Sequence, residues 1–507
     1  MSAIIELNLK DNVYFNVRCG TDQAYELKGF FSCYTPNYKF NPKYKAKMWD
    51  GKITFFNIYD RLLPIGLLPK LKEFCKNHDY TLTYNFSMKE LRNNITQEDL
   101  IPFYDTLFSD GKIYPHDYQQ EAIYKTLSKK RGVLEACTSF GKSIVLYTIL
   151  RYIMNDVDNK ILIIVPTINL VNQLYSDMQD YGWEDIHNHV SRLYGDSKDC
   201  DLSKKILIST WQSIYKRHDN FFSQYEAVIC DETHMCKSLS LTTILKKCVN
   251  ATYRIGMTGT LPMDHADRYN IFGFIGPLIY QLKSHELITT GFLSDIKIVN
   301  MHIKYPIEEI KKIVNITYAE EVKYLVQNEK RDGILKYIID SKYIKDEDNI
   351  LVLAQRIEHI KKTVEYLKNL YPNRKILKIS GETNPDERES IRKSIDNESG
   401  VILVATYGTF STGISIKKLH HVIFLSFYRS RIKVLQSLGR GLRKHNTKSF
   451  VIIWDIVDDM RWKLKQRSNT KNEYGMNYAY LHFLERLKFY DDQKFKYINK
   501  VVQLEKL

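Results

Sequence analysis

The segment 136–143 (ACTSFGKS) places a glycine, a lysine and a serine in direct succession after small residues. It follows a short apolar run and precedes an amphipathic stretch, which predicts a loop between a strand and the first turn of a helix. Backbone N–H groups at such a helix N-terminus form a cradle for an anion. There the Lys142 ammonium would reach the β- and γ-phosphates of ATP, and the Ser143 hydroxyl would ligate Mg²⁺. The residues predicted to bind the nucleotide phosphates are Thr138, Ser139, Gly141, Lys142 and Ser143.

Two adjacent carboxylates end the apolar run in the segment 228–234 (VICDETH). Asp231 would hold Mg²⁺ directly or through water, and Glu232 would orient and deprotonate an attacking water molecule. About 90 residues separate Asp231 from Lys142, which is consistent with another strand of the same sheet. Cys230, His234 and Cys236 also fall here, but we favour the acidic motif over a metal-binding cysteine cluster.

A basic pair follows in the segment 436–443 (QSLGRGLR). Arg440 and Arg443 are three residues apart, so on a helix they share one face. Arginines presented across a cleft to a γ-phosphate stabilise the charge that spreads in the transition state of phosphoryl transfer. With Gln436, they form a second group of predicted catalytic residues.

Several polar residues sit near or directly after predicted strands. Gln119 lies about 20 residues before the phosphate loop, and its amide could read an adenine edge. Loops that follow strands line the ligand edge of an open α/β sheet, where small hydroxyl groups can contact phosphates. The residues of this kind are Thr167, Thr210, Gln212, Thr258, Thr260 and Thr406. Of these, we predict that Thr167, Thr210, Gln212 and Thr406 contact the nucleic-acid backbone.

The elements that must position these residues are short β-branched runs alternating with amphipathic stretches. This alternation predicts a parallel sheet with crossover helices, and it occurs twice, so we expect two lobes with a cleft between them. The pattern pauses at 291–304. The predicted strands are 132–135, 161–165, 206–209, 227–230, 254–257, 350–354, 375–379, 401–405, 422–425 and 450–454.

The domain boundaries follow from the same patterns. We predict a small mixed α/β domain at 1–95, with a strand at 52–57 and a helix at 67–77, and then a polar linker at 87–112. The first lobe spans 113–285 and the second 286–465. A C-terminal extension at 466–507 is predicted to be helical from its amphipathic pattern through 478–502.

Composition narrows the class of protein. The 507 residues carry a formal net charge of +15, which favours a polyanionic partner such as nucleic acid. Eight cysteines occur without a Cys-x-x-Cys pair, so neither a zinc ribbon nor a redox dithiol is indicated, and reduced thiols are typical of a cytosolic protein. We see no secretory signal, and no apolar run approaches the ~20 residues of a membrane span.

The order of the motifs resembles that of superfamily 2 helicases of the DExH type, over about 115–455. The matching series is Gln119, 141–143, 166–167, 210–212, 231–234, 258–260, Thr406 with 412–413, and 436–443. The resemblance implies an α/β fold of two tandem RecA-like lobes with a phosphate-binding loop. It implies that Gln119 reads adenine, that Gly413 contributes to the nucleotide site, and that His234, Thr258 and Thr260 couple hydrolysis to lobe movement. Position 415 departs from the pattern, since a serine stands where many relatives have an aspartate near the ribose.

A closer resemblance, to bacteriophage recombination and repair helicases, covers nearly the whole chain. It is carried by 49–52 (WDGK), 61–66 (RLLPIG), 410–415 (FSTGIS) and 419–422 (LHHV). It implies a DNA helicase that unwinds branched DNA, migrates junctions and regresses stalled forks in a host bacterial cytoplasm. DNA would be bound without sequence preference, and a monomer is expected.

The N-terminal domain interleaves lysines with aromatic residues, a pattern suited to backbone contact and base stacking. Trp49 and Lys52 are its predicted DNA contacts. Two alternatives share the motor motifs, namely an RNA helicase and the motor subunit of a nucleic-acid-processing complex such as a restriction enzyme. A clamp without ATPase activity is disfavoured, because Lys142, Asp231 and Glu232 are all present.

Overall fold

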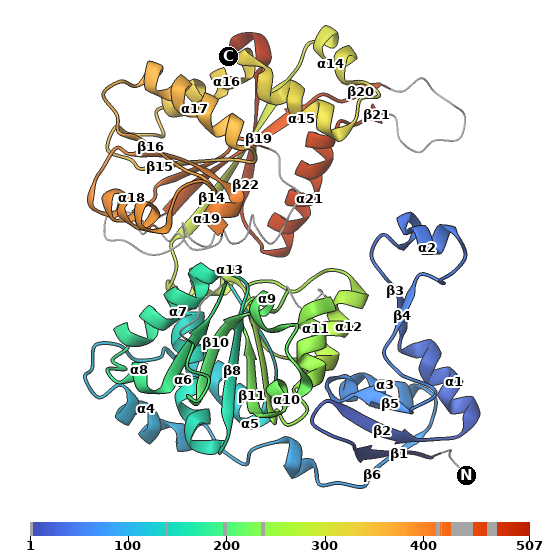
Figure 1. Ribbon diagram of the computed structural model, residues 1–507. Coiled ribbons are helices and arrows are strands. Elements are labelled where there is room, and N and C mark those ends of the chain that lie inside the picture. The colour runs from blue at the N-terminus through green and yellow to red at the C-terminus, as the bar shows by residue number, and fades with distance from the viewer. Residues whose placement is uncertain are drawn as a thin grey trace. The chain divides into compact units, whose positions relative to one another are not determined.

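The computed structural model describes residues 4–137, 139–195, 200–234, 239–411, 416, 418–426, 450–463 and 474–507. The chain folds into two compact units (Figure 1). The first contains residues 1–136 and 140–282, and the second contains residues 283–507 together with 137–139. Among the described residues, every helix is too short or too polar to cross a lipid bilayer.

The first unit begins with a four-stranded sheet in the order β5-β2-β1-β6. Its strands are β1 (Ile4–Leu9), β2 (Tyr14–Arg18), β5 (Leu62–Pro64) and β6 (Thr81–Tyr84), and its helices are α1 (Thr21–Phe30) and α3 (Leu68–Asn77). A two-stranded arm, β3 (Ser32–Tyr34) with β4 (Lys52–Thr54), carries the short helix α2 (Pro42–Lys45) at its end. The predicted helix at 67–77 is confirmed as α3. The predicted strand at 52–57 ends at Thr54, because Phe55 and Phe56 are buried in the core instead of continuing the arm.

The N-terminal domain packs mainly against helix α12 (His265–Phe274), which covers one face of the large sheet, and one apolar cluster runs through both parts of the unit. The Asn12 N–H donates to the Val249 carbonyl at 3.0 Å, and Arg131 Nη2 donates to the Asn12 carbonyl at 2.9 Å. The closest approach is at Gly66, where an added Cβ would lie 1.8 Å from the Phe272 carbonyl oxygen of helix α12. The two parts therefore share one core, and the N-terminal sheet is part of the fold of the first unit.

Gly66→Ala is expected to destabilise the first unit by about 1–3 kcal/mol, because the new methyl group meets backbone that no side-chain rotation can move. Denaturant unfolding followed by circular dichroism measures this. Gly29→Ala is the matched control: Gly29 lies in α1, and nothing lies within 4 Å of its added Cβ. That substitution should be neutral or slightly stabilising, since alanine favours a helix over glycine. Equal effects of the two substitutions would contradict the close approach.

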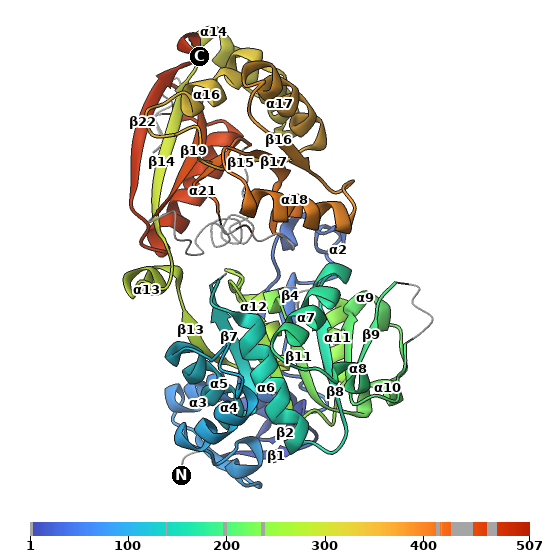
Figure 2. The ribbon, with the colours of Figure 1, turned by 90° about the vertical axis from the view of Figure 1, so that its left-hand side faces the viewer.

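The large sheet of the first unit has seven parallel strands in the order β13-β7-β12-β11-β8-β10-β9. They are β7 (Arg131–Ala136), β8 (Lys160–Val165), β9 (Val190–Leu193), β10 (Ile206–Thr210), β11 (Tyr225–Cys230), β12 (Tyr253–Thr258) and β13 (Leu278–Leu282). Helices α5 (Asp117–Lys129), α6 (Lys142–Asp156) and α7 (Ile168–Asp180) pack in a row on one face, and α11 (Leu239–Lys247) and α12 on the other (Figure 2). All five strands predicted in this region are present, and β9 and β13 are additional.

The prediction of a polar linker at 87–112 is wrong for the second half of this segment. Helix α4 (Ile101–Leu107) lies there and packs on α6. Leu100, Tyr104 and Phe108 are buried at almost helical spacing, while the intervening residues are mostly polar and hide this pattern.

The second unit has its own seven-stranded parallel sheet in the order β16-β17-β15-β18-β19-β14-β22. The strands are β14 (Asp295–Lys304), β15 (Ile350–Ala354), β16 (Ile376–Ile379), β17 (Ile402–Thr406), β18 (His421–Phe424), β19 (Phe450–Asp459) and β22 (Tyr497–Gln503). Strand β14 occupies the stretch where the sequence pattern pauses. The extension is helical only in α21 (Tyr478–Asp492), because residues 497–503 form β22 beside β14 (Figure 2). The C-terminal residues thus complete the second sheet, which corrects the predicted helical extension.

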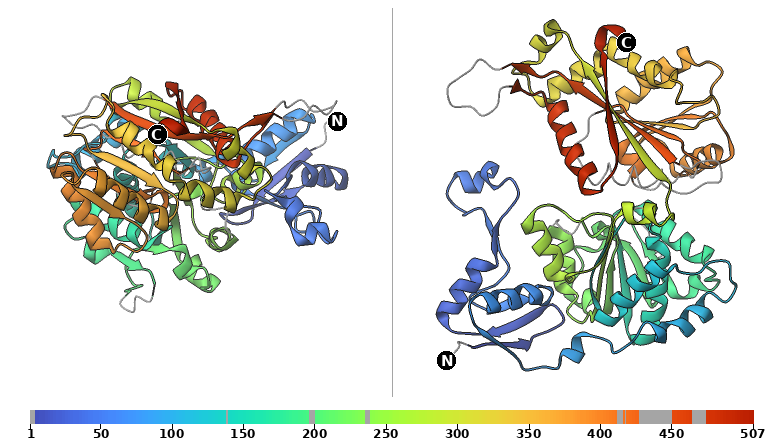
Figure 3. Two further views of the ribbon diagram at one scale, coloured as in Figure 1. Left: turned by 90° about the horizontal axis from the view of Figure 1, so that it is seen from above. Right: turned by 180° about the vertical axis from the view of Figure 1, so that it is seen from behind.

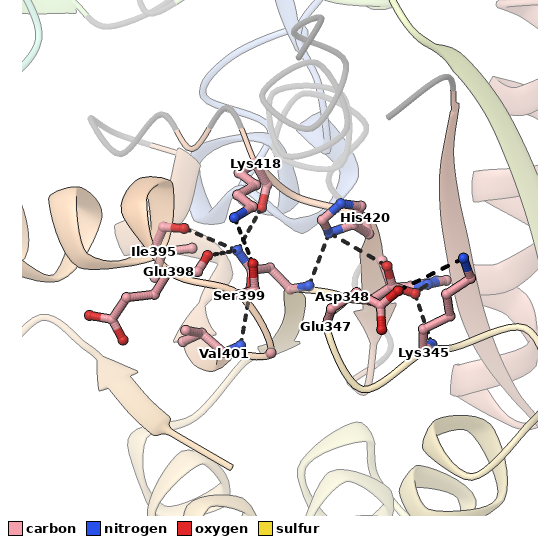
Figure 4. A network of polar contacts seen from close by, with 12 residues as sticks. Lys345, Glu347, Asp348, Ile395, Glu398, Ser399, Val401, Lys418 and His420 are labelled. Atoms are coloured by element: carbon pink, nitrogen blue, oxygen red, sulfur yellow. Dashed lines mark hydrogen bonds and ion pairs between the residues drawn. The ribbon is translucent and has the colours of Figure 1, made fainter. Parts of the chain in front are cut away.

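A buried amide holds together the loops that enter this sheet. Asn349 Nδ2 donates to the carbonyls of Ile395, Glu398 and Lys418, each at 3.0 Å, and Asn349 Oδ1 accepts from the Val401 N–H. The Asn349 N–H donates to His420 Nδ1 at 3.0 Å. Figure 4 shows these groups converging from separate segments of the chain. The network lies where β15, β17 and β18 begin, at the edge opposite to Thr406, so its role is structural.

Candidate active site

The phosphate loop joins β7 to α6, as predicted. Ser139 and Gly141 both have left-handed backbone angles, with φ of 78° and 87°, and Gly141 is the N-cap of α6. Such left-handed residues beside a helix N-terminus turn successive N–H groups toward one point, which is an anion cradle. A Cβ at Gly141 would lie 2.4 Å from Gln119 Nε2, so this position needs glycine for space as well as for its conformation. Thr138 lies outside the described residues.

Gln119 is buried and connects α5 to this loop. Its Oε1 accepts from the His116 N–H at 2.8 Å, and its Nε2 donates to the Phe140 carbonyl at 2.7 Å. A glutamine amide has two donor hydrogens and two acceptor lone pairs, so one of each stays available for a base edge. The geometry is compatible with the predicted adenine contact and adds a second role, in which Gln119 holds the loop in place.

The two residues at the start of α6 already have partners within the protein. Lys142 Nζ donates to the Ala136 carbonyl at 3.4 Å, which is a long and weak hydrogen bond. Ser143 Oγ lies 2.8 Å from the Tyr181 hydroxyl. Tyr181 has no signal in the sequence, because it follows the end of α7 and belongs to no motif. The structure places it in contact with the predicted metal ligand.

Asp231 and Glu232 follow β11 at the same edge of the sheet. The Glu232 N–H donates to Asp231 Oδ1 at 2.9 Å, and Glu232 has a left-handed φ of 54°, which is uncommon for a residue with a side chain. Burial, and then the neighbouring Glu232 carboxylate, raise the pKa of Asp231 to about 6, against the lowering effect of the Lys142 ammonium. Two neighbouring carboxylates, Asp231 and Glu232, therefore lie beside the phosphate loop, where a bound cation would stabilise their charged forms.

This donor set fits a divalent cation held jointly by protein and nucleotide. A carboxylate and a hydroxyl are oxygen donors, which Mg²⁺ prefers, and Mg²⁺ is usually bound by one or two carboxylates with substrate phosphates. Among the residues that the structure describes, no cluster of three or more His, Cys, Asp or Glu side chains could hold a metal ion alone. Asp231 with Ser143 could therefore supply the protein ligands while phosphate oxygens supply others.

A chain of polar contacts connects the end of β11 with the end of β12. Glu232 Oε2 lies 3.2 Å from His234 Nδ1, and that nitrogen lies 3.1 Å from Thr258 Oγ1. Thr258 Oγ1 in turn donates to the Thr260 carbonyl at 2.9 Å. The structure thus brings the three predicted coupling residues together, next to Glu232.

Thr233 is a member of this site that sequence reasoning missed. Its hydroxyl contacts the carbonyls of Cys230 and Met257, and so bridges β11 and β12. A Cβ at Gly256 would lie 2.7 Å from Thr233 Oγ1, so the glycine makes this bridge possible. The bridge fixes the distance between the two strand ends that carry Glu232 and Thr258.

The predicted nucleic-acid contacts are partly used in local structure. Thr167 caps α7 by accepting from the Leu170 N–H, and Thr210 Oγ1 lies 2.9 Å from Ser213 Oγ. Thr406 Oγ1 donates to Thr409 Oγ1 at 2.7 Å in the second unit. Gln212 is exposed. Thr210 ends β10 and Thr167 follows the adjacent strand β8, so the first unit brings these two hydroxyls to one edge of its sheet.

Trp49 and Lys52 lie in the arm, whose strands form a two-stranded sheet separate from the large sheet. Other predicted site residues lie outside the described residues, and their predicted roles stay predictions. They are Gly413, Gln436, Arg440 and Arg443.

Comparison with known proteins identifies the families to which these segments are similar. Residues 4–85 match the family described as DNA helicase UvsW, N-terminal. Residues 112–263 match the type III restriction enzyme res subunit family, and residues 329–445 match the helicase conserved C-terminal domain.

Similarity to individual proteins extends over the full length. The chain is 33% identical over 508 residues to the ATP-dependent DNA helicase uvsW of Enterobacteria phage T4, covering 99% of this chain and 100% of that protein. It is 27% identical over 407 residues to the DNA 3'-5' translocase XPB2 of Sulfurisphaera tokodaii, covering 72% and 86%. The crystal structure of T4 UvsW matches with a TM-score of 0.50 and 32% identity, over 99% of this chain and 100% of that chain. These matches confirm the predicted tandem RecA-like fold with its N-terminal domain.

Proposed function

The chain belongs to the UvsW family of DNA helicases, and from that premise we propose that it unwinds and branch-migrates branched DNA in recombination, repair and replication-fork rescue. The observation that carries this proposal is the 33% identity along the full length, which includes the N-terminal domain as well as the motor. As an ATP-dependent DNA helicase, the chain uses ATP with a divalent cation, which we propose to be Mg²⁺. We place its action in the cytoplasm of a bacterial host.

In the proposed mechanism, each site residue of the first unit has a defined role. The N–H groups of the phosphate loop and the Lys142 ammonium hold the nucleotide phosphates. Ser143 and Asp231 would hold Mg²⁺, which would supply neutralising charge at the phosphates. Glu232 orients the attacking water and takes its proton. Because His234 contacts both Glu232 and Thr258, a change at the γ-phosphate position can move the end of β12.

The second unit supplies the remaining parts of the proposal. Arg440 and Arg443 reach the γ-phosphate when the lobes close, Gln436 and Gly413 complete the nucleotide site, and Thr406 contacts the DNA backbone with Thr167, Thr210 and Gln212. We propose the lobes as 113–285 and 286–465. The protein acts as a monomer on DNA of any sequence, because phosphate contacts carry no sequence information.

ATP hydrolysis measured with different nucleic acids tests this proposal. Matched single-stranded, duplex, forked and four-way DNA are compared with RNA of the same sequences. We expect forked and four-way DNA to stimulate hydrolysis most, with apparent affinity falling steeply between about 50 and 200 mM salt as counterions return to the phosphates. Stimulation by RNA alone would overturn the proposal in favour of an RNA helicase, and stimulation by no nucleic acid would overturn it altogether.

A further inference from the structure

The arm of the N-terminal domain, residues 32–54, is a folded two-stranded element, and most side chains at its far end are exposed to solvent. Its strands pair in the register Ser32↔Thr54, Cys33↔Ile53 and Tyr34↔Lys52. At its base, Phe55 packs edge-on against Tyr269 of α12, with ring centroids 5.8 Å apart. Figures 1 and 3 show the arm, in blue, extending away from the four-stranded sheet with α2 at its far end.

The part beyond the strands, residues 35–51, which we call the arm tip, is held rigid by aromatic packing. The ring of Tyr38 stacks on Tyr34 at 4.4 Å and meets Tyr44 edge-on at 4.9 Å. The chain returns past the Tyr38 ring at Gly51, where φ is 81° and an added Cβ would lie 2.5 Å from that ring. Trp49 Nε1 donates to the Lys52 carbonyl at 2.8 Å, which fixes the indole. A rigid site loses little conformational entropy when it binds a ligand.

The arm tip nevertheless leaves apolar surface uncovered. Phe40 is 75% exposed and Met48 is 78% exposed. Met48 and Trp49 line an open hollow of about 650 Å³ together with Tyr44, Asp50 and three lysines. Exposed apolar side chains on a fixed support, rimmed by polar groups, mark an interaction site.

The charge of the side chains around this hollow indicates which class of partner it binds. The arm carries five lysines, three of which line the hollow, and Asp50 is its single acidic residue. Among the described residues, no ion pair involves any of these lysines. The lysines are Lys39, Lys43, Lys45, Lys47 and Lys52. Unneutralised lysines attract a polyanion, and their combination with exposed rings is the composition of surfaces that stack nucleic-acid bases.

We propose that the arm tip is a base-stacking site for the branch point of DNA, which deepens the function proposed above and rests on it. Within a continuous duplex both faces of every base are covered by its neighbours, whereas a branch point exposes base faces. Trp49 and Met48 receive an exposed base face, and Lys45 and Lys47 contact the flanking phosphates. The site thereby distinguishes a branch point from continuous duplex DNA by shape, independent of sequence.

Binding measurements on full-length variants test the site. The DNA ligands are a three-way fork and a blunt duplex of equal length, labelled for fluorescence anisotropy. Trp49→Ala should weaken fork binding by about 5- to 100-fold, the value of one base–aromatic stack, and change duplex binding far less. Trp49→Phe should restore most of the preference for the fork. Tyr59→Ala is the matched control, since Tyr59 is 91% exposed but lies outside the arm, and it should keep the wild-type preference.

A second measurement separates stacking from charge and from a folding defect. With 2-aminopurine at the branch point, wild-type protein should quench its fluorescence and Trp49→Ala should not. The double variant Lys45→Ala with Lys47→Ala should weaken fork and duplex binding alike and lower the salt slope by about 2. Equal loss of fork and duplex binding in Trp49→Ala, or quenching that survives it, would overturn the inference. Failure of the proposed function would be distinguishable from failure of this inference, because the wild-type protein would then show no DNA-stimulated ATP hydrolysis.

Discussion

Glu232→Gln is expected to lower DNA-stimulated ATP hydrolysis by about 10²–10⁴-fold while ATP and forked DNA still bind. Glutamine has the shape of glutamate but cannot take a proton from the attacking water, and a positioned general base contributes a factor of this size. The substitution leaves the Lys142 ammonium, the phosphate loop and the Asp231 carboxylate unchanged. The loss should therefore appear in kcat, with the affinity for nucleotide retained.

The measurement is steady-state hydrolysis at saturating forked DNA, with fork binding followed in parallel by anisotropy. Glu226→Gln is the matched control, because Glu226 lies on the same strand, β11, but near its opposite end, where Glu226 accepts from the N–H groups of Asp158 and Asn159. The Glu226→Gln variant should hydrolyse ATP at a rate close to that of the wild-type protein. Full activity in Glu232→Gln would show that another residue is the base, and the mechanism would have to be reassigned.

Sequence alone predicts the central strands of both sheets and the motifs that follow them. Strands such as β8 and β15 are buried on both faces, so they are continuous apolar runs, and the polar residues after them fall at one edge of a parallel sheet. The sequence therefore predicts that the phosphate loop and Asp231 belong to one site.

The strands that the sequence does not reveal have a mixed composition. Strand β14 alternates apolar residues with Lys297, Asn300 and His302, and β22 lies at the sheet edge with most of its side chains at least partly exposed. An edge strand has one neighbouring strand and lies open to solvent along its other side, so its side chains follow no strict apolar pattern. The amphipathic pattern of the C-terminal segment therefore predicts a helix that runs beyond the end of α21.

Within the site, sequence reasoning misses contacts made across the fold. Tyr181 meets Ser143 from 38 residues away in the sequence, and Thr233 bridges two strands because Gly256 lets its hydroxyl approach. Such partners are determined by packing, and no motif spacing indicates them.

Asp455→Ala is expected to destabilise the second unit by about 3–5 kcal/mol, the cost of leaving a buried charge without its partner. Asp455 on β19 is fully buried and accepts from Arg486 of α21 through two bonds, Nε to Oδ2 at 2.9 Å and Nη2 to Oδ1 at 2.8 Å. The Tyr490 hydroxyl donates to the same carboxylate at 2.8 Å. Two planar bonds and a third donor make Asp455 the main polar link between α21 and the sheet.

Denaturant unfolding of the full chain measures this effect, with each unfolding transition fitted separately because a chain of two units need not unfold in one step. Glu485→Ala is the control: Glu485 pairs with Lys488 on the solvent side of α21, and an exposed pair of this kind contributes little. Replacing both partners, Asp455→Leu with Arg486→Met, should recover much of the loss, because the removed carboxylate then leaves no buried charge behind. If the double variant were as unstable as Asp455→Ala, the loss would come from packing around β19, and α21 would be held by its apolar face instead of by this ion pair.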